Sequence, residues 1–407
     1  MPVEEIFHRQ QYAQEIVQDL LKPTVLKEQL RSGVFLSGIR RVGKTTFVRQ
    51  DLIPALRGAG ALPIYVDLWA DKSKDPSTLV HEAVRNALQA VENPASGILA
   101  QLKRLKGLDV GAAGFKFGFQ LDSLGATDGV TLAQAFAEVV RKLQVDVVLI
   151  VDEVQQAMLS DSGINLMHAL KAARDRINAD PDMPGHFLFV GTGSHKSLVS
   201  DMAIRRTQPF AGAVAVDFRV LDRDFVEWQL ERVASHDARV VVPNLDAAVQ
   251  GFRAMGNRPE EFTKALLQLQ RVQIVDNDVA GAFKIICQTL ADAAGDVELA
   301  AIENFGELGK AIFDRIARGR TTGLFGAEAL AAYSELTGQP VVARDVQLTA
   351  DKMIEANLIM RQGHGIYAVS DPFIQKIWTE RIQATQQLLG GDGTRGGEPP
   401  LPDPARS

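Results

Sequence analysis

Residues 38–45 read Gly38-Ile-Arg-Arg-Val-Gly-Lys-Thr45 and match the pattern GxxxxGK[ST] at every fixed position. A short apolar segment, 34–36, precedes them, and residues 45–57 have helical periodicity that stops at Gly58 and Gly60. Glycines let the backbone curl so that successive N–H groups point at phosphates, and the dipole of the following helix favours the same anion. We therefore predict a phosphate-binding loop between a strand and a helix. The alternative is a glycine-rich turn with an exposed lysine.

Each residue type in this loop suits a different part of a nucleoside triphosphate bound with Mg²⁺. Lys44 is expected to reach the β- and γ-phosphates, and the Thr45 hydroxyl to bind Mg²⁺. Thr46 can add a hydroxyl toward the α-phosphate. The residues expected to contact the nucleotide are Gly38, Arg40, Arg41, Val42, Gly43, Lys44, Thr45 and Thr46.

Two adjacent carboxylates, Asp152 and Glu153, follow the apolar run 147–151. Such a run is typical of a strand that is buried on both faces of a parallel sheet. Asp152 is expected to hold the water shell of Mg²⁺ beside Thr45, and Glu153 to orient and deprotonate the attacking water. The alternative is a strand end that simply emerges into solvent, but unpaired buried charges are expensive.

A third apolar run, 186–190, continues into Gly191-Thr-Gly-Ser194. A polar residue at this strand end would lie between the two motif strands, so Thr192 and Ser194 are candidates for contact with the γ-phosphate or the water. An ordinary turn is the alternative.

The order of the predicted elements indicates the domain organisation. Strands alternate with helices over residues 1–221, which predicts a doubly wound α/β domain with a parallel sheet. Residues 94–128 read as an insertion, in which the alternating segment 115–121 predicts a hairpin or an edge strand. Helical patterns then fill 222–298, and 299–387 show three helices, a hairpin signal at 363–365 and a last helix, which is the order of a winged helix-turn-helix. The Gly- and Pro-rich segment 388–407 is expected to be disordered.

The loop, the segment 149–156 and the segment 187–194 resemble the prokaryotic (archaeal-type) ATPase family of the AAA+/STAND group of P-loop ATPases. The resemblance covers roughly residues 5–385. It implies ATP as the nucleotide, a strand between the two motif strands, a helical lid and a C-terminal winged helix. Lys44 and Thr45 match the family's Walker A residues, Asp152 and Glu153 match Walker B, and Thr192 or Ser194 falls near sensor 1.

Two further arginine roles follow from the resemblance. Segment 255–266 resembles the sensor-2 region, with Arg258 as a γ-phosphate contact or, alternatively, a solvent-facing helix start. Relatives often carry Pro-Leu-Tyr-Gly-Arg where this chain has Pro209-Phe-Ala-Gly-Ala213, so the arginine is missing. Arg205 and Arg206, just upstream, are either an arginine finger, in cis or from a neighbouring subunit of a homo-oligomer, or surface charges.

Composition limits the remaining possibilities. The 407 residues are 46% apolar and 23% charged, as in a globular chain of two or three domains. No apolar run approaches the roughly 20 residues of a membrane helix. The N-terminus does not resemble a secretory signal, and Cys287 is the only cysteine, so we expect a cytoplasmic protein with this residue in core packing.

Charge bears on the kind of partner. The net charge is -6, and residues 303–381 hold nine basic and ten acidic side chains, a weak footprint for a phosphate backbone. The best basic cluster is Arg315, Arg318 and Arg320, although these can equally complement a helix C-terminus. We therefore expect an ATP-hydrolysing switch that acts on a protein partner. The alternative is an ATP-dependent regulator that binds DNA through the winged helix; a third, ATP binding without turnover, is disfavoured by Glu153.

Overall fold

The computed structural model describes residues 5–71, 73–106, 116–125, 129–204, 208–237, 239–363 and 365–390. The chain divides into two compact units. The first holds residues up to 253 together with 257–284, and the second holds 254–256 and the residues from 285 onward. Among the described residues, no helix is both long and apolar enough to cross a bilayer.

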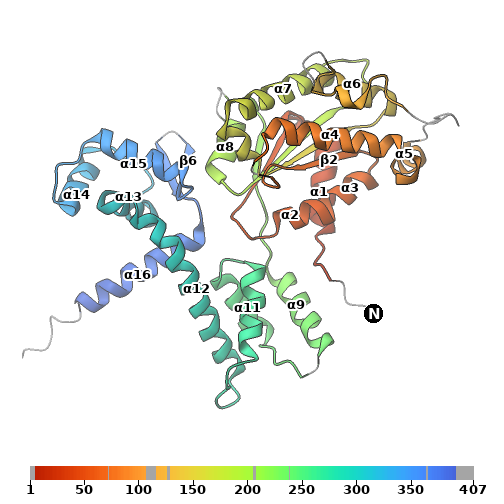
Figure 1. The fold of residues 1–407 in the computed structure, drawn as a ribbon. Helices are drawn as coiled ribbons and strands as arrows, with labels where there is room; N and C mark the ends of the chain where they lie inside the picture. Colours follow the sequence, from red (N-terminus) through yellow and green to blue (C-terminus); the bar gives the residue numbers. More distant parts are fainter. Residues whose placement is uncertain are drawn as a thin grey trace, which may run out of the picture. The chain divides into compact units, whose positions relative to one another are not determined.

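The first unit is built around a parallel sheet of five strands in the order β2-β3-β4-β1-β5 (Figure 1). The strands are β1 (Val34–Ser37), β2 (Leu62–Asp67), β3 (Val147–Asp152), β4 (Phe187–Gly193) and β5 (Val214–Asp217). Every strand predicted from an apolar run is present. The strand β4 lies between β1 and β3, as the resemblance implied. Because all the strands are parallel, the loop after β1 and the carboxylates after β3 lie at the same edge of the sheet.

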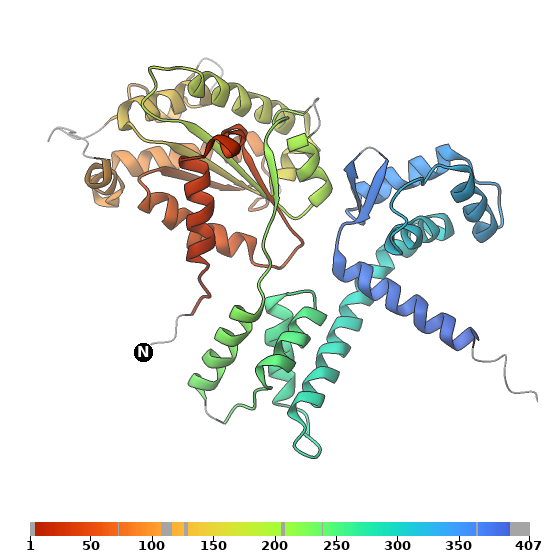
Figure 2. The ribbon, with the colours of Figure 1, turned by 180° about the vertical axis from the view of Figure 1, so that it is seen from behind.

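Helices cover both faces of the sheet, so the motif strands are apolar throughout (Figures 1 and 2). Val147, Leu149 and Val151 pack on one side, and Val148 and Ile150 on the other. The first side is covered by α4 (Pro76–Glu92), α6 (Leu132–Leu143), α7 (Asp161–Asn178) and α8 (Lys196–Ile204). The second is covered by α1 (Gln10–Leu21) and by a continuous helical run made of α2 (Lys44–Phe47), a π-turn (Val48–Leu52) and α3 (Ile53–Gly58). A 3-10 helix (Val25–Ser32) leads from α1 into β1.

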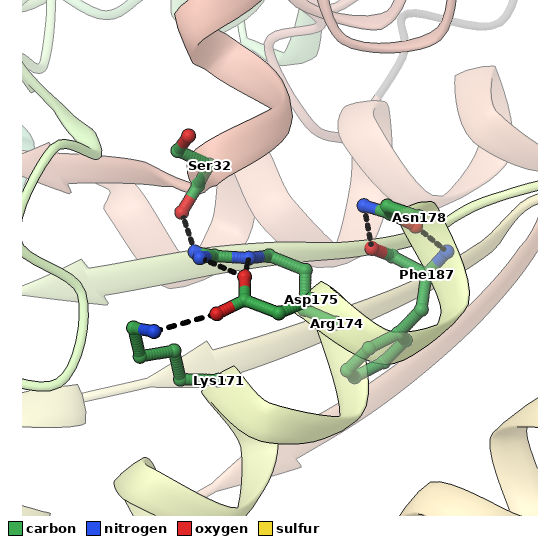
Figure 3. A network of polar contacts seen from close by, with 6 residues as sticks. All are labelled: Ser32, Lys171, Arg174, Asp175, Asn178 and Phe187. Atoms are coloured by element: carbon green, nitrogen blue, oxygen red, sulfur yellow. Dashed lines mark hydrogen bonds and ion pairs between the residues drawn. The ribbon is translucent and has the colours of Figure 1, made fainter. Parts of the chain in front are cut away.

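Polar contacts fasten α7 to the amino ends of β1 and β4 (Figure 3). Arg174, only 7% exposed, donates to the carbonyl of Ser32 just before β1 and to Asp175. The side-chain amide of Asn178 makes two hydrogen bonds with the backbone of Phe187, of 2.9 and 3.0 Å, at the start of β4. These contacts fix the strands at the edge opposite to the phosphate loop.

The strand or hairpin predicted for 115–121 is wrong over its described part, 116–121, which contains no strand. Phe117 and Phe119 stack on each other, with ring centroids 5.9 Å apart, and Phe117 is buried in the core. Its backbone N–H donates to the Glu92 carboxylate of α4 instead of to a strand. The alternation therefore reflects two rings packed on helices. The helix α5 (Ile98–Lys106) and two 3-10 turns (Pro94–Ser96 and Leu121–Ser123) make up the other regular structure described in this insertion.

Four helices follow the sheet: α9 (Arg223–His236), α10 (Leu245–Ala254), α11 (Pro259–Leu269) and α12 (Val279–Glu303). The parts of them in the first unit pack around Phe225, Phe252, Phe262 and Phe283. The helix α12 extends beyond the predicted boundary at 298 and is shared by the two units. Cys287 lies on α12 and is buried, as predicted, and burial raises the pKa of its thiol to about 12.

The second unit contains α13 (Gly306–Ala317), α14 (Ala327–Thr337), α15 (Ala343–Glu355), an antiparallel hairpin and α16 (Pro372–Gly390). The hairpin strands are β6 (Ile359–Gly363) and β7 (Ile366–Val369). The elements follow one another in the predicted order of three helices, a hairpin and a helix. The helix α16 continues to Gly390, into the segment expected to be disordered from 388, and residues 391–407 of that segment lie outside the described residues.

Candidate functional site

The predicted phosphate loop connects the buried strand β1 directly to α2, which begins at Lys44. Gly43 has a φ of 86°, in the left-handed region that glycine adopts without strain. Gly38 lies so close to Phe218 that an added Cβ would be 3.1 Å from the Phe218 Cβ. Arg41 also has a positive φ, of 65°, which costs a non-glycine residue roughly 1–2 kcal/mol. The path of the backbone thus favours glycine at both positions.

Lys44 points into the protein and not into solvent. The residue is 6% exposed, and its ammonium donates to the carbonyls of Gly38 and Ile39 at 2.7 Å each. Burial lowers its pKa to about 8, against the opposing attraction of Glu153 and Asp152. The exposed-lysine alternative is therefore wrong. The ammonium lies inside the curl of the loop, where phosphate oxygens can replace the two carbonyls.

Thr45 and Asp152 come together as a metal site would need. The Thr45 hydroxyl donates to Asp152 Oδ2 at 2.7 Å, and Asp152 is 1% exposed. Tyr65, on the neighbouring strand β2, donates to the same oxygen at 3.1 Å. Hydroxyl and carboxylate oxygens are the ligands that Mg²⁺ prefers, completed by water and substrate phosphates. The residues thus fit a magnesium ion held jointly with a triphosphate.

No group of three or more His, Cys, Asp or Glu side chains suited to a metal occurs within the described ranges. A magnesium ion at this edge would therefore depend on Thr45, Asp152 and phosphate oxygens together.

Glu153 follows β3 in a left-handed conformation, with a φ of 53°. Its Oε2 accepts a hydrogen bond from the Ser194 hydroxyl at 2.9 Å and a short one from the side-chain amide of Gln155. Gln155 and Ser194 are both buried. The strand end therefore does not simply emerge into solvent, because its second carboxylate is held in a defined position beside the phosphate loop.

The two polar candidates of β4 have different contacts. The fully buried Thr192 hydroxyl donates to Asp152 Oδ1, whereas Ser194 contacts Glu153. Both lie between the motif strands, as the order β3-β4-β1 requires. Thr192 therefore supports the first of the two carboxylates and Ser194 the second.

A cavity of about 460 Å³ lies next to the loop. Its walls come from the N-terminal segment, the loop and α2, and the helices α9 and α11 of the same unit. Aromatic rings line one part of it: Phe7, Phe225 and Trp228 have mutual centroid distances of 5.6 to 5.9 Å. Arg9, Gln229 and Thr263 add polar groups. Charged side chains, among them Asp51, Arg232 and Glu260, also line the cavity, so it offers a nucleobase one aromatic wall among polar groups.

The arginine predictions have separate outcomes. Arg258 is 5% exposed at the start of α11, so the solvent-facing alternative is wrong, and it does not line the cavity. Its role as a γ-phosphate contact stays a prediction. Arg205 and Arg206 lie outside the described residues. Arg41 of the loop points to Glu261 of α11, with 3.9 Å between charged atoms.

Sequence reasoning missed Tyr65, Gln155 and the aromatic residues of the cavity. Tyr65 is found only once the register pairs Asp67 with Asp152, which brings the ring beside the carboxylate. Gln155 lies in a 3-10 turn that folds its amide back onto Glu153. A polar residue two positions after the second carboxylate was the available signal.

The basic cluster of the second unit is largely neutralised. Arg315 pairs with Glu328 at 3.7 Å and has a side chain only 12% exposed, and Arg318 pairs with Asp314 at 2.9 Å. On α15, Asp351 pairs with Arg361 of the hairpin at 2.6 Å. This unit therefore presents less free positive charge than its composition allows.

Comparisons with known proteins agree with the fold. The chain is similar to a Walker-type ATPase of Pyrococcus abyssi, with 19% identity over 92% of this chain and 96% of that chain and a TM-score of 0.54. It also matches the ORC2 protein of Aeropyrum pernix, solved as ADPNP–ADP complexes, with 14% identity over 94% of this chain and 98% of that chain and a TM-score of 0.47. No protein-family model matches the sequence. Comparison with curated proteins gives no match.

The strand order and the first of these likenesses together define the class. The chain has an AAA+-like P-loop NTPase fold, with a five-stranded parallel sheet followed by helices.

Proposed function

We propose that this protein binds ATP with Mg²⁺ and hydrolyses it to ADP and phosphate. The observation that carries the proposal is the convergence of Lys44, Thr45, Asp152 and Glu153 at one edge of the sheet, joined by the 2.7 Å contact between Thr45 and Asp152. Structural packing alone gives no reason to gather a buried ammonium and two carboxylates around a glycine-rich loop.

The chain's own residues have distinct parts in this reaction. The loop amides and Lys44 bind the β- and γ-phosphates, and Thr45 and Asp152 hold Mg²⁺, which when bound offsets the phosphate charge. Glu153 accepts a proton from a water molecule whose oxygen bonds to the γ-phosphorus. The bond from that phosphorus to the β–γ bridging oxygen breaks, and the electron pair leaves with ADP.

We propose that the adenine base occupies the 460 Å³ cavity against Phe7 and Trp228. An aromatic wall gives stacking energy to any base, so selection of adenine depends on polar groups such as Gln229 and Thr263. We also propose, on the loop and strand motifs, that the chain belongs to the archaeal-type ATPase family of the AAA+/STAND group.

The decisive test separates binding from turnover. Glu153→Gln keeps the size of the side chain and its hydrogen bonds to Ser194 but removes the base. We expect ATP affinity within about threefold of wild type and hydrolysis lowered at least about 100-fold, as for loss of a general base. Lys44→Ala should instead weaken ATP binding itself. Undiminished hydrolysis by the glutamine variant would remove Glu153 from the proposed role.

We further propose that nucleotide state is transmitted to a protein partner. The pairing of Arg315 and Arg318 with acidic side chains supports this over the DNA-regulator alternative. DNA binding that falls steeply between about 50 and 200 mM salt and is lost in an Arg315, Arg318 and Arg320 triple alanine variant would favour the alternative. Mass in solution with and without ATP would show whether the partner includes further copies of this chain.

A further inference from the structure

Arg40, in the middle of the phosphate loop, spans the edge of the sheet where the reaction is proposed to occur. Its guanidinium lies 5.2 Å from the ring centroid of Trp69, which follows β2, and its Nε donates to the Ser194 hydroxyl at 3.5 Å. The loop itself follows β1. In the order β2-β3-β4-β1 the side chain therefore crosses the carboxyl ends of β4 and β3. Asp152 and Glu153 emerge at the end of β3.

The same hydroxyl links Arg40 to the proposed base. Ser194 Oγ accepts from Arg40 and donates to Glu153 Oε2 at 2.9 Å, while the Ser194 backbone N–H also points at this oxygen, at 3.4 Å. Because a carboxylate can only accept, the single hydroxyl proton of Ser194 belongs to the bond with Glu153. A change in the position of Arg40 thus alters a contact of the group that holds Glu153.

Arginine is suited to move between these partners and a phosphate. Its planar guanidinium can rest one face on an aromatic ring while the N–H groups on its edge stay available to oxygen atoms. Arg40 is solvent-exposed, and it is close enough to Lys44 to lower the pKa of that ammonium, after the larger effect of burial. A cation beside Lys44 that also contacts Ser194 is well placed for the terminal phosphate.

We propose that Arg40 binds the γ-phosphate of ATP and, through Ser194, links the presence of that phosphate to the orientation of Glu153. This inference rests on the proposed ATP hydrolysis. Without a triphosphate, Arg40 remains on Trp69 and Ser194. With one, the guanidinium turns to the γ-phosphate oxygens, and Ser194 keeps its hydrogen bonds with Glu153 and Gln155. ADP lacks the group that draws Arg40 away.

The neighbouring Arg41 provides a matched control. It has the same side chain, lies one position further in the loop and is 63% exposed, but it points to Glu261 of α11 and not to Ser194. Its contact with Glu261 predicts no preference for a triphosphate over a diphosphate.

The experiment measures the affinities of ADP and of a non-hydrolysable ATP analogue, both with Mg²⁺, for wild type, Arg40→Ala, Arg40→Lys and Arg41→Ala. Arg40→Ala should weaken analogue binding about 10-fold to 100-fold, as for a lost hydrogen bond to a charged group, and leave ADP affinity within about threefold. Arg40→Lys should recover part of this loss. Arg41→Ala should change both affinities by the same factor.

Two further readouts test the link to Glu153. Analogue binding should change the fluorescence of Trp69. This change is measured as the part of the tryptophan signal that the analogue produces and ADP does not. Arg40→Ala should abolish it. Ser194→Ala should keep the preference for the analogue over ADP but lower kcat about tenfold or more, because Glu153 loses a positioning contact.

Equal losses of ADP and analogue affinity in Arg40→Ala, at unchanged melting temperature, would overturn the assignment of Arg40. This outcome differs from failure of the proposed function, in which wild type itself would neither bind nor hydrolyse ATP. A normal kcat in Ser194→Ala would overturn the link through Ser194.

Discussion

The lowered pKa of Lys44 predicts an unusual loss of ATP affinity at mildly alkaline pH. Burial lowers this pKa from 10.5 to about 8, which disfavours the charged ammonium by about 3 kcal/mol relative to water. The terminal phosphate of ATP has already lost its last proton at pH 8, since the second pKa of a phosphate group is about 6. Lys44 is therefore the group of the phosphate loop whose charge changes between pH 7 and 9.

The magnitude follows from the fraction of charged lysine. With a pKa of about 8, roughly nine tenths of the free protein carries the ammonium at pH 7 and one tenth at pH 9. Bound phosphates restore the charge, so binding takes up a proton above pH 8. We expect ATP to bind about tenfold more weakly at pH 9 than at pH 7.

Stability changes in the opposite direction. The unfolded chain keeps the Lys44 proton up to about pH 10.5, whereas the folded chain releases it near 8. The unfolded state thus binds more protons between these values, and the contribution of Lys44 to the free energy of unfolding rises with pH across this window. A loss of ATP affinity at pH 9 therefore cannot come from unfolding caused by deprotonation of Lys44.

Calorimetric titration with ATP and Mg²⁺ at pH 7, 8 and 9, in buffers of different ionisation enthalpy, measures both affinity and proton uptake. Lys44→Met serves as the control, because it should bind weakly and without this pH dependence. An affinity that stays constant from pH 7 to 9, with no proton uptake, would refute the reasoning from burial.

Two further predictions test other parts of the first unit. Gly193→Ala would place a Cβ 2.6 Å from Val199 and even closer to the Gln155 side chain. Because Gln155 must then leave Glu153, we expect hydrolysis to fall about tenfold or more while ATP binding persists. Unchanged turnover would contradict the positioning of Glu153 by Gln155. Arg174→Met removes the donor to the Ser32 carbonyl and should lower the free energy of unfolding in urea by about 1–3 kcal/mol. The control Lys171→Met removes a more exposed partner of Asp175 and should lower it by less than about 1 kcal/mol.

The sheet and its two motifs could be predicted because their signals are local. A strand buried on both faces needs a continuous apolar run, and a phosphate loop needs glycines and a lysine at fixed spacing, so β1, β3 and β4 are readable from the sequence. The segment 116–121 was misread for the same local reason. Its alternating rings satisfy the pattern of a strand while packing against helices.

The supporting contacts of the site could not be predicted because they depend on register and on distant segments. Tyr65 reaches Asp152 from 87 positions away, and Ser194 reaches Glu153 from 41 positions away. The cavity combines the segment around Phe7 with α9 and α11. The periodicity of one segment contains no information on such long-range contacts. The meeting of the motif residues at one edge could be predicted, because the strands are parallel and their carboxyl ends lie together.

The hydrogen bonds of Asp152 indicate how the site is prepared for metal. Its two oxygens accept from Thr45, Tyr65, Thr192 and the backbone N–H of Glu153, which occupies about all of the lone-pair positions of a carboxylate. The proton of the Thr45 hydroxyl is thereby directed to Asp152, and its lone pairs remain for Mg²⁺. We infer that Thr45 binds the ion directly and that Asp152 positions the Thr45 hydroxyl for it. Thr45→Ser should then retain Mg²⁺-dependent ATP binding, and the isosteric Thr45→Val should lose it, whereas equal Mg²⁺ dependence in both variants would mean that Asp152 alone determines the metal site.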